Sequence, residues 1–297
     1  MSYRHIENLY KNKEVLLFKQ CYAMEKIHGT SANVHYNQET DQLSFFSGGS
    51  KHESFVTFFD QENLLEAFRQ NKVEHPEVKN ITIWGEAYGG KLQGMSKTYG
   101  PALKFVAFEV CVDDQWFAVK QADFFVQKFG LEFVHYEVID TTEEAINTAM
   151  MADSVQAVRN GMGAGHMREG VVLRPLIELV HPNGGRIICK HKRSEFAERE
   201  TTPSFTDPEE LKILEDAGAI AEEWCTMMRL HHVLDMMTNP QMEDAQKIIK
   251  AMLADIEREA SGEILESKAS RKEIGKKTMK LFKEFLMSNT YTGPSNV

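Results

Sequence analysis

The segment EKIHGT at residues 25–30 places a lysine, Lys26, among small and polar neighbours. An amine attacks a phosphoryl group only in its neutral form, and free lysine, with a pKa near ~10.4, reaches that form with the help of nearby cations and partial desolvation. Gly29 lets the backbone approach a ligand closely or adopt a positive φ. On its own a loop lysine is more often a solvated charge, so the chemical interpretation depends on partners elsewhere in the chain.

Partners of suitable types follow in order along the chain: Gly85-Glu86, Phe108-Glu109, Glu169-Gly170 and Lys190-His191-Lys192. Lys190 and Lys192 are two residues apart in an expected strand, so they share one face and can together hold phosphate oxygens. The simpler interpretation of this pair is a solvated edge strand, and it stays open at this point.

Glu169 is the carboxylate best suited to a divalent metal ion. When an amine attacks a phosphoryl group, charge builds up on the phosphoryl oxygens and on the departing group, and a metal ion with lysines stabilises that charge. Glu169 is equally compatible with a surface glutamate at the start of a strand. Core packing also explains Phe108, because Val106 and Val110 share its face, so periodicity alone does not assign Phe108 to a ligand site.

This ordered set resembles the covalent nucleotidyltransferases, which include DNA ligases, RNA ligases and mRNA capping enzymes. The form Lys26-x-His28-Gly29 is similar to the RNA ligase 2 family of ATP-dependent RNA ligases, and the motifs cover roughly residues 1–200. The resemblance implies an ATP-dependent polynucleotide ligase that joins 3′-OH and 5′-phosphate ends through a covalent lysyl-AMP intermediate, at nicks in duplex RNA or RNA/DNA hybrids.

The resemblance also implies roles for individual residues. Lys26 is the expected nucleophile, Lys190 and Lys192 are the expected catalytic contacts to the α-phosphate, and Glu169 is the expected ligand of Mg²⁺ or Mn²⁺. The residues expected at bound ATP are Glu25, Ile27, His28, Gly29, Glu86 at the ribose, Phe108 stacked on adenine, Glu169, Lys190 and Lys192. The residues expected at the nucleic acid are Thr30, Lys51 and Arg174.

One stretch departs from the family pattern. RNA ligase 2 relatives usually carry an arginine in the turn after the second strand, but residues 46–51, FSGGSK, have none, so Lys51 or a backbone amide is expected to substitute. A DNA ligase or a capping-type nucleotidyltransferase is an alternative, disfavoured by His28 in place of aspartate and by the lack of an evident oligonucleotide-binding barrel after residue 200. A catalytically inactive nucleotide- or RNA-binding module is disfavoured by the joint presence of the lysines and glutamates above.

Composition narrows the class of protein. The 297 residues suffice for one large domain and a smaller one, and the net charge of −10 argues against non-specific coating of nucleic acid while allowing a local basic groove. Cys21, Cys111, Cys189 and Cys225 are scattered without a Cys-x-x-Cys pair, which indicates reduced thiols and no zinc site. With no apolar run of membrane-spanning length and no secretory leader, we expect a cytoplasmic monomer with nucleic acid as its partner.

The helices and strands that must position these residues indicate an α+β fold. We expect a short helix or ordered arm at residues 1–12, strands from 15 to 46 around the lysine loop, and a helix at 61–70. Strands are expected at 81–84, ending at Gly85-Glu86, and at 104–112, helices at 122–129 and 142–159, and strands at 167–173 and 186–190. Together these form an adenylyltransferase (nucleotidyltransferase) domain over residues 1–202, with ATP-grasp-like antiparallel sheets and helices.

Residues 203–297 predict a small all-helical C-terminal domain. A helix is expected to start at Asp207-Pro208 and to run to 237, a second spans 240–259, and a third starts at Ser270 with Glu273 as its capping-box partner. Five lysines of the third helix lie off its apolar face and form a basic strip suited to backbone phosphates, or else a merely solvated face: Lys272, Lys276, Lys277, Lys280 and Lys283.

Overall fold

The computed structural model describes residues 3–201, 203–206, 213–237 and 239–290, and of residues 289 and 290 only the backbone. The chain divides into two compact units, Met1–Arg193 and Ser194–Val297. This division falls earlier than the predicted boundary between residues 202 and 203. Residues after the division also contact the helical unit, since Arg199 forms ion pairs with Glu223 and Glu263.

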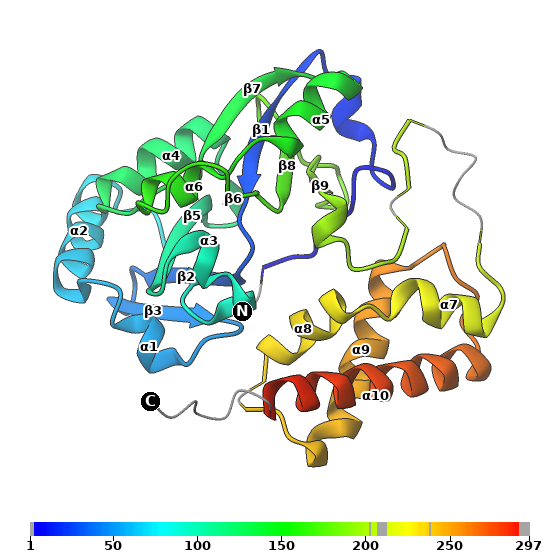
Figure 1. Ribbon diagram of the computed structural model, residues 1–297. Helices are drawn as coiled ribbons and strands as arrows, with labels where there is room; N and C mark the ends of the chain where they lie inside the picture. The colour runs from blue at the N-terminus through cyan, green and yellow to red at the C-terminus, as the bar shows by residue number, and fades with distance from the viewer. Residues whose placement is uncertain (1–2, 202, 207–212, 238, 291–297) are drawn as a thin grey trace. The chain divides into compact units, whose positions relative to one another are not determined.

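The first unit contains two antiparallel sheets, which confirms the predicted α+β class (Figure 1). In one sheet the strand order is β7 (Tyr136–Asp140), β1 (Gln20–Lys26), β8 (Gly170–Pro175) and β9 (Cys189–Lys192). The register pairs Lys26 with Gly170, and Gly170 in turn with Lys192. Residues far apart in sequence are thereby brought to one end of three neighbouring strands.

The second sheet has the order β3 (Gln42–Ser47), β2 (Thr30–Asn37), β4 (Asn80–Gly89), β5 (Leu103–Val112) and β6 (Gln115–Trp116). The pairing of β4 with β5 shifts by one residue between Trp84 and Gly85. The prediction that this strand ends at Gly85-Glu86 is wrong: the chain stays extended to Gly89, and the irregularity at Gly85 bends the ladder without ending it.

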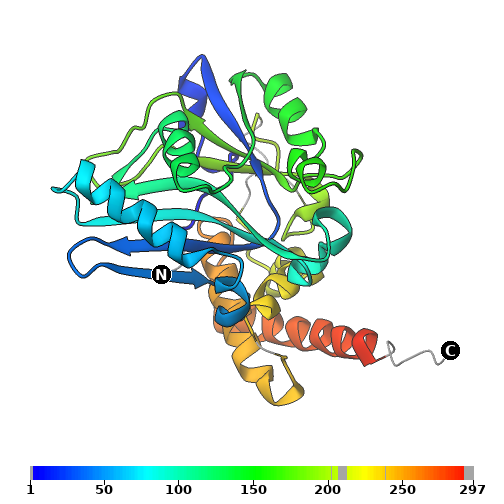
Figure 2. The same ribbon diagram turned by 90° about the vertical axis from the view of Figure 1, so that its left-hand side faces the viewer.

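Helices cover both sheets of this unit. The helices α1 (His52–Val56) and α4 (Val119–Lys128) pack against the second sheet, and α5 (Glu143–Met151) packs against the first. Figure 2 looks onto the helix α2 (Gln61–Glu74), which lies across the strands of the second sheet. Its buried Phe68 explains this position, since the Phe68 ring lies 4.8 Å from the Tyr36 ring and 4.3 Å from the Phe129 ring. The short helices α3 (Ser96–Tyr99) and α6 (Val155–Arg159) complete this unit with the 3₁₀ turns η1 (Glu14–Leu17) and η2 (Leu92–Gly94).

Two further predictions for this unit need correction. Residues 14–17 form the 3₁₀ turn η1, so the first strand starts only at Gln20. The helix predicted over 142–159 is two helices, because the Ser154 side chain accepts a hydrogen bond from the Ala157 amide and starts α6. Of the two alternatives predicted for the chain start, the ordered arm is the one observed over residues 3–12, with a bridge to β9 between Asn8 and Lys190 and a turn at residues 9–11.

The second unit is built mainly of helices over its described residues. They are the 3₁₀ turn η3 (Ser194–Phe196), α7 (Ala217–Trp224), α8 (Met227–Asp235), the 3₁₀ turn η5 (Met242–Asp244), α9 (Ala245–Glu259) and α10 (Lys268–Thr290). The predicted helix start at residues 207–210 lies outside the described residues, and α7 is capped instead by Asp216. The predicted face of α10 is confirmed by burial of Ile274, Thr278 and Phe282. Its predicted capping box is wrong: Ser270 exchanges hydrogen bonds with Ser267, one turn earlier.

No helix in the described parts of the chain combines the length and the apolar character needed to cross a membrane.

Candidate active site

Glu169 is the centre at which two of the three predicted catalytic lysines, Lys26 and Lys192, meet. Its carboxylate lies 2.8 Å from the Lys26 Nζ, 2.9 Å from the Lys192 Nζ and 3.2 Å from the His28 Nδ1. The side chain of Glu169 is only 2% exposed, whereas that of Lys26 is 22% exposed. The strand register that aligns Lys26, Gly170 and Lys192 explains the cluster, because Glu169 directly precedes Gly170.

The electrostatic state of Glu169 follows from these contacts. Burial alone would raise the pKa of Glu169, but the nearby Lys192 and Lys26 ammonium groups, with His28, hold it well below its usual range. One ionised carboxylate therefore stands among two lysines and a histidine. The two ammonium groups outnumber the single carboxylate, and this excess of positive charge suits a phosphate group.

The lysine loop packs closely on β4. A Cβ atom at Gly29 would lie 2.2 Å from the Ala87 carbonyl oxygen, so only glycine allows this approach. The Gly29 amide also donates a hydrogen bond of 3.1 Å to the Glu86 Oε1. Glu86, predicted at the ribose, is thus beside the lysine loop.

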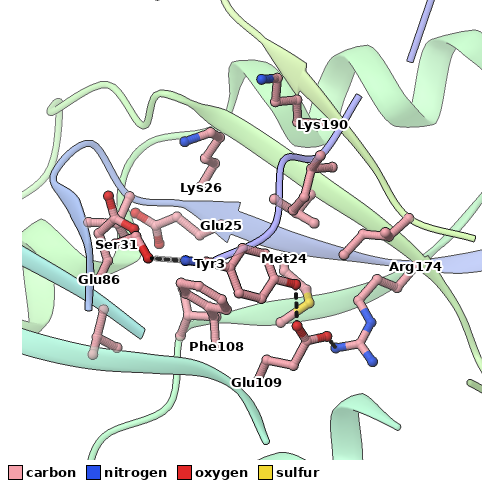
Figure 3. Close-up of a pocket in the computed structure, with 16 residues that line it drawn as sticks. Tyr3, Met24, Glu25, Lys26, Ser31, Glu86, Phe108, Glu109, Arg174 and Lys190 are labelled. Atoms are coloured by element: carbon pink, nitrogen blue, oxygen red, sulfur yellow. Dashed lines mark hydrogen bonds and ion pairs between the residues drawn. The ribbon is translucent and has the colours of Figure 1, made fainter. Parts of the chain in front are cut away.

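A pocket adjoins this cluster between the two sheets (Figure 3). Seven predicted residues line it, namely Glu25, Lys26, Ile27, Glu86, Phe108, Arg174 and Lys190. Alternation along β9 explains the position of Lys190, since Lys190 lines the pocket while His191 points to the other face and contacts Asn147 of α5. The pocket thus combines an aromatic side chain, a carboxylate and two lysines.

Because side chains alternate along β1, the side chain of Glu25 has different neighbours from that of Lys26. Its carboxylate is bound by the start of α6, where the Ser154 hydroxyl donates at 2.5 Å and the Val155 and Gln156 amides donate at 3.0 and 3.2 Å. These bonds hold the Glu25 carboxylate at the start of α6. The same bonds fix the strand residue that precedes Lys26.

Arg174 lines the pocket but is 1% exposed. Its guanidinium pairs with Glu109 at 2.8 Å and with Glu178 at 2.5 Å, and its contact with nucleic acid remains a prediction. Arg186 also contacts Glu109 and Glu178. Burial raises the pKa of Glu109, but Arg174 and Arg186 outweigh it and lower that pKa.

Thr30 and Lys51, the other predicted nucleic-acid contacts, lie outside the residues that line the pocket. Lys51 is exposed and directly precedes α1, and Thr30 begins β2 next to the turn at Gly48. Their roles remain predictions.

Sequence reasoning missed Tyr3, Met24 and Ser31, which also line the pocket. Met24 carried a usable signal, because it precedes Lys26 by two residues in a strand and must share its face. A tyrosine near the chain start carried no comparable signal.

The side chains around Glu169 can hold a divalent metal ion only if a bound ligand supplies further oxygen donors. Among the described residues, no group of three or more His, Cys, Asp or Glu side chains is arranged to hold a metal ion. Glu169 offers a single carboxylate, and Mg²⁺ is commonly bound by one or two carboxylates together with substrate phosphates and water. The residues present therefore fit an ion that arrives with a phosphorylated ligand.

Solved structures of Naegleria gruberi RNA ligase match the chain: a mutant with AMP and Mn at 14% identity and a TM-score of 0.49, the protein with PPi at 13% and 0.45, and a mutant with ATP and Mn at 16% and 0.48. Each match covers 66% of this chain and 57% of the solved chain. None of the curated proteins compared with the chain matches it.

The family model for RNA ligase matches residues 19–192, more than half of the chain. The matched range runs from the residue before β1 to Lys192 and includes Lys26, Glu86, Glu169 and Lys190. The chain belongs to the RNA ligase family.

Proposed function

We propose that this protein is an ATP-dependent RNA ligase that forms a covalent lysyl-AMP intermediate on Lys26. The observation that carries the proposal is the convergence of Lys26, His28 and Lys192 on the buried Glu169, beside a pocket that Phe108 and Glu86 line. An amine nucleophile, cations for phosphate and a cavity with an aromatic wall are the parts that nucleotidyl transfer to lysine requires.

In the first step, the neutral Lys26 amine attacks the α-phosphate of ATP. A nitrogen–phosphorus bond forms, the bond to pyrophosphate breaks, and the amine gives up a proton. Lys26 is held by Glu169 at 2.8 Å, so this contact has to break before the amine is free to attack. Lys190 and Lys192, on one face of β9, then hold the phosphoryl oxygens.

Glu169 is the residue that would hold Mg²⁺ or Mn²⁺. Such an ion, when bound, neutralises charge on the phosphates. The remaining predicted contacts to ATP are assigned to Phe108 at adenine, Glu86 at ribose, and Glu25 with the loop residues Ile27, His28 and Gly29.

In the later steps, AMP moves from Lys26 to a 5′-phosphate end, and a 3′-OH then displaces AMP to form the phosphodiester bond. We assign the nucleic acid to contacts with Thr30 and Lys51 and to the lysines of α10. Of these lysines, Lys276 pairs with Glu273 and Lys277 contacts Glu222, whereas Lys272, Lys280 and Lys283 are exposed. The exposed three are the better candidates for backbone phosphates.

The test uses ATP and GTP, each labelled at the α-phosphate, with Mg²⁺ and a denaturing gel. Label from ATP alone should stay on the protein, and unlabelled ATP should then support sealing of a 5′-phosphate nick in duplex RNA. Label from GTP would indicate a capping-type enzyme, and no label would indicate a binding module. A nick sealed only between DNA strands would indicate a DNA ligase.

A further inference from the structure

The arm at residues 3–9 connects both sheets of the first unit at the pocket. At its start, the Tyr3 amide donates a hydrogen bond of 3.1 Å to the Ser31 Oγ on β2, and the Tyr3 hydroxyl donates to Glu109 on β5. At its end, the Lys190 amide donates to the Glu7 carbonyl at 2.9 Å, and the Leu9 amide donates to the Lys190 carbonyl at 2.8 Å. The arm is thus bound at the aromatic side and at the lysine side of one pocket.

The Tyr3 ring lies inside this pocket beside the predicted base platform. Its centroid is 5.1 Å from that of Phe108 and 5.3 Å from that of Trp84, both in edge-to-face geometry. Figure 3 shows the ring next to Phe108 with its hydroxyl directed at Glu109. Edge-to-face contacts of this kind stabilise a fixed ring orientation.

The hydroxyl of Tyr3 is held as a donor. Burial and the charge of Glu109 raise the pKa of the Tyr3 phenol, so the proton stays on its oxygen. Glu109 is 1% exposed and ionised, and a buried carboxylate that loses a hydrogen-bond partner is costly. The bond therefore resists any rotation of the ring away from Phe108.

We propose that Tyr3 is a positioning residue of the nucleotide pocket. Its ring closes the pocket beside Phe108, its bond to Glu109 fixes that ring, and residues 7–9 hold the backbone of Lys190 in register. The inference rests on the proposed function for the identity of the ligand as ATP. The arm would then take part in nucleotide binding, in addition to stabilising the fold through its hydrogen bonds to both sheets.

The test compares Tyr3→Phe and Tyr3→Ala with a control, Tyr10→Phe. Tyr10 is a buried tyrosine of the same segment that lies outside the pocket lining, so its variant reports the general effect of losing a hydroxyl there. Two readouts are taken in the full chain: ATP binding by tryptophan fluorescence, since Trp84 and Trp116 lie near the Tyr3 ring, and single-turnover adduct formation over a range of ATP concentrations.

We expect Tyr3→Phe to raise the half-saturating ATP concentration about tenfold with a nearly unchanged rate at saturation. Tyr3→Ala should raise that concentration about a hundredfold and also slow the saturated rate, because both the wall and its anchor are lost. Tyr10→Phe should bind ATP as the parent does. If Tyr3→Ala fails to fold, Tyr3→Phe decides the outcome alone.

Two results would overturn the proposal. ATP binding and rates within about twofold of the parent in the folded variants would mean that the arm only stabilises the fold. Tighter ATP binding by Tyr3→Ala would mean that the Tyr3 ring occupies the place of the base. A parent that binds ATP but forms no adduct would reject the proposed function while the binding readout still judges Tyr3. A parent that binds no ATP would reject both.

Discussion

Two buried glutamates of the first unit are each surrounded by cations, but by cations of different kinds. Glu169 contacts Lys26, Lys192 and His28. Glu109 contacts Arg174 and Arg186. In both places the cations lower the pKa of the carboxyl against the effect of burial, so both carboxylates are ionised.

The difference lies in what the partners can do next. A guanidinium is always protonated and holds a carboxylate through a planar fork, whereas a lysine amine can lose its proton and act as a nucleophile. The arginine cluster, Glu109 with Arg174 and Arg186, therefore has a structural role at the pocket. The lysine cluster holds its charges in contacts that a phosphorylated ligand can replace, and the predictions below separate these two roles.

The largest effect should come from Lys26→Ala, which removes the nucleophile. We expect no covalent adduct, with the fold retained, because the Lys26 side chain is partly exposed and no neighbour replaces its amine. Lys26→Arg keeps the positive charge and should also form no adduct, since a guanidinium stays protonated. A denaturing gel with α-labelled ATP measures the outcome. Labelled protein from either folded variant would place the nucleophile elsewhere.

Glu169→Gln should slow adduct formation by about 10²–10³, because it removes one charge from the site of phosphoryl transfer. Lys190→Ala and Lys192→Ala should each have an effect of similar size. Rapid-quench measurement at saturating ATP gives the rates. Glu137→Gln, at an exposed position of β7, is the matched control and should behave as the parent. Rates within about twofold of the parent for all three site variants would show that the phosphate site lies elsewhere.

Arg174→Met should affect stability more than chemistry. Removing one partner of a buried ion pair costs about 3–5 kcal/mol in the free energy of unfolding, because the carboxylate is left poorly compensated. Urea denaturation measures this loss, and folded protein at saturating ATP should still form the adduct at a rate within about tenfold of the parent. Unchanged stability, or loss of the adduct in folded protein, would remove the distinction between the two clusters.

The smallest effect should come from the helical unit. Reversing the charges of Lys272, Lys280 and Lys283 to glutamate should reduce nick sealing roughly tenfold, through the loss of three modest exposed contacts to phosphates. Adduct formation with ATP alone should not change. Lys250→Glu, on the exposed face of α9, is the control. Sealing by the triple variant at the parent's rate would leave the basic strip as a solvated face.

The sequence predicted the lysine cluster better than the arginine cluster. Lys26, Glu169 and Lys192 stand in recognisable motifs on strands of regular alternation, so their types and spacing indicated a shared site. Burial of Arg174 depends on Glu109 in the other sheet, and no local pattern reports a contact between distant strands. The same holds for Tyr3, whose position depends on an arm without periodicity.

The boundaries of helices and strands were also hard to predict where they depend on contacts between residues that are distant in the sequence. Residues 142–159 read as one helix because apolar positions recur throughout, and the break is made by Ser154, which caps α6 while also donating to Glu25 on β1. A serine that could cap was visible in the sequence, but its strand partner was not. Glu86 likewise looked like a strand end, since Gly85 favours an irregularity whose extent only the pairing with β5 defines.

The central claim is that Lys26 itself carries AMP during the reaction. The most direct measurement is mass spectrometry of peptides from the native-sequence protein after incubation with ATP and Mg²⁺, under conditions that preserve a nitrogen–phosphorus bond. The account predicts one AMP on the peptide that contains Lys26, and its loss when a 5′-phosphorylated nick is added. AMP on another residue, or an adduct that persists in the presence of the nick, would contradict it.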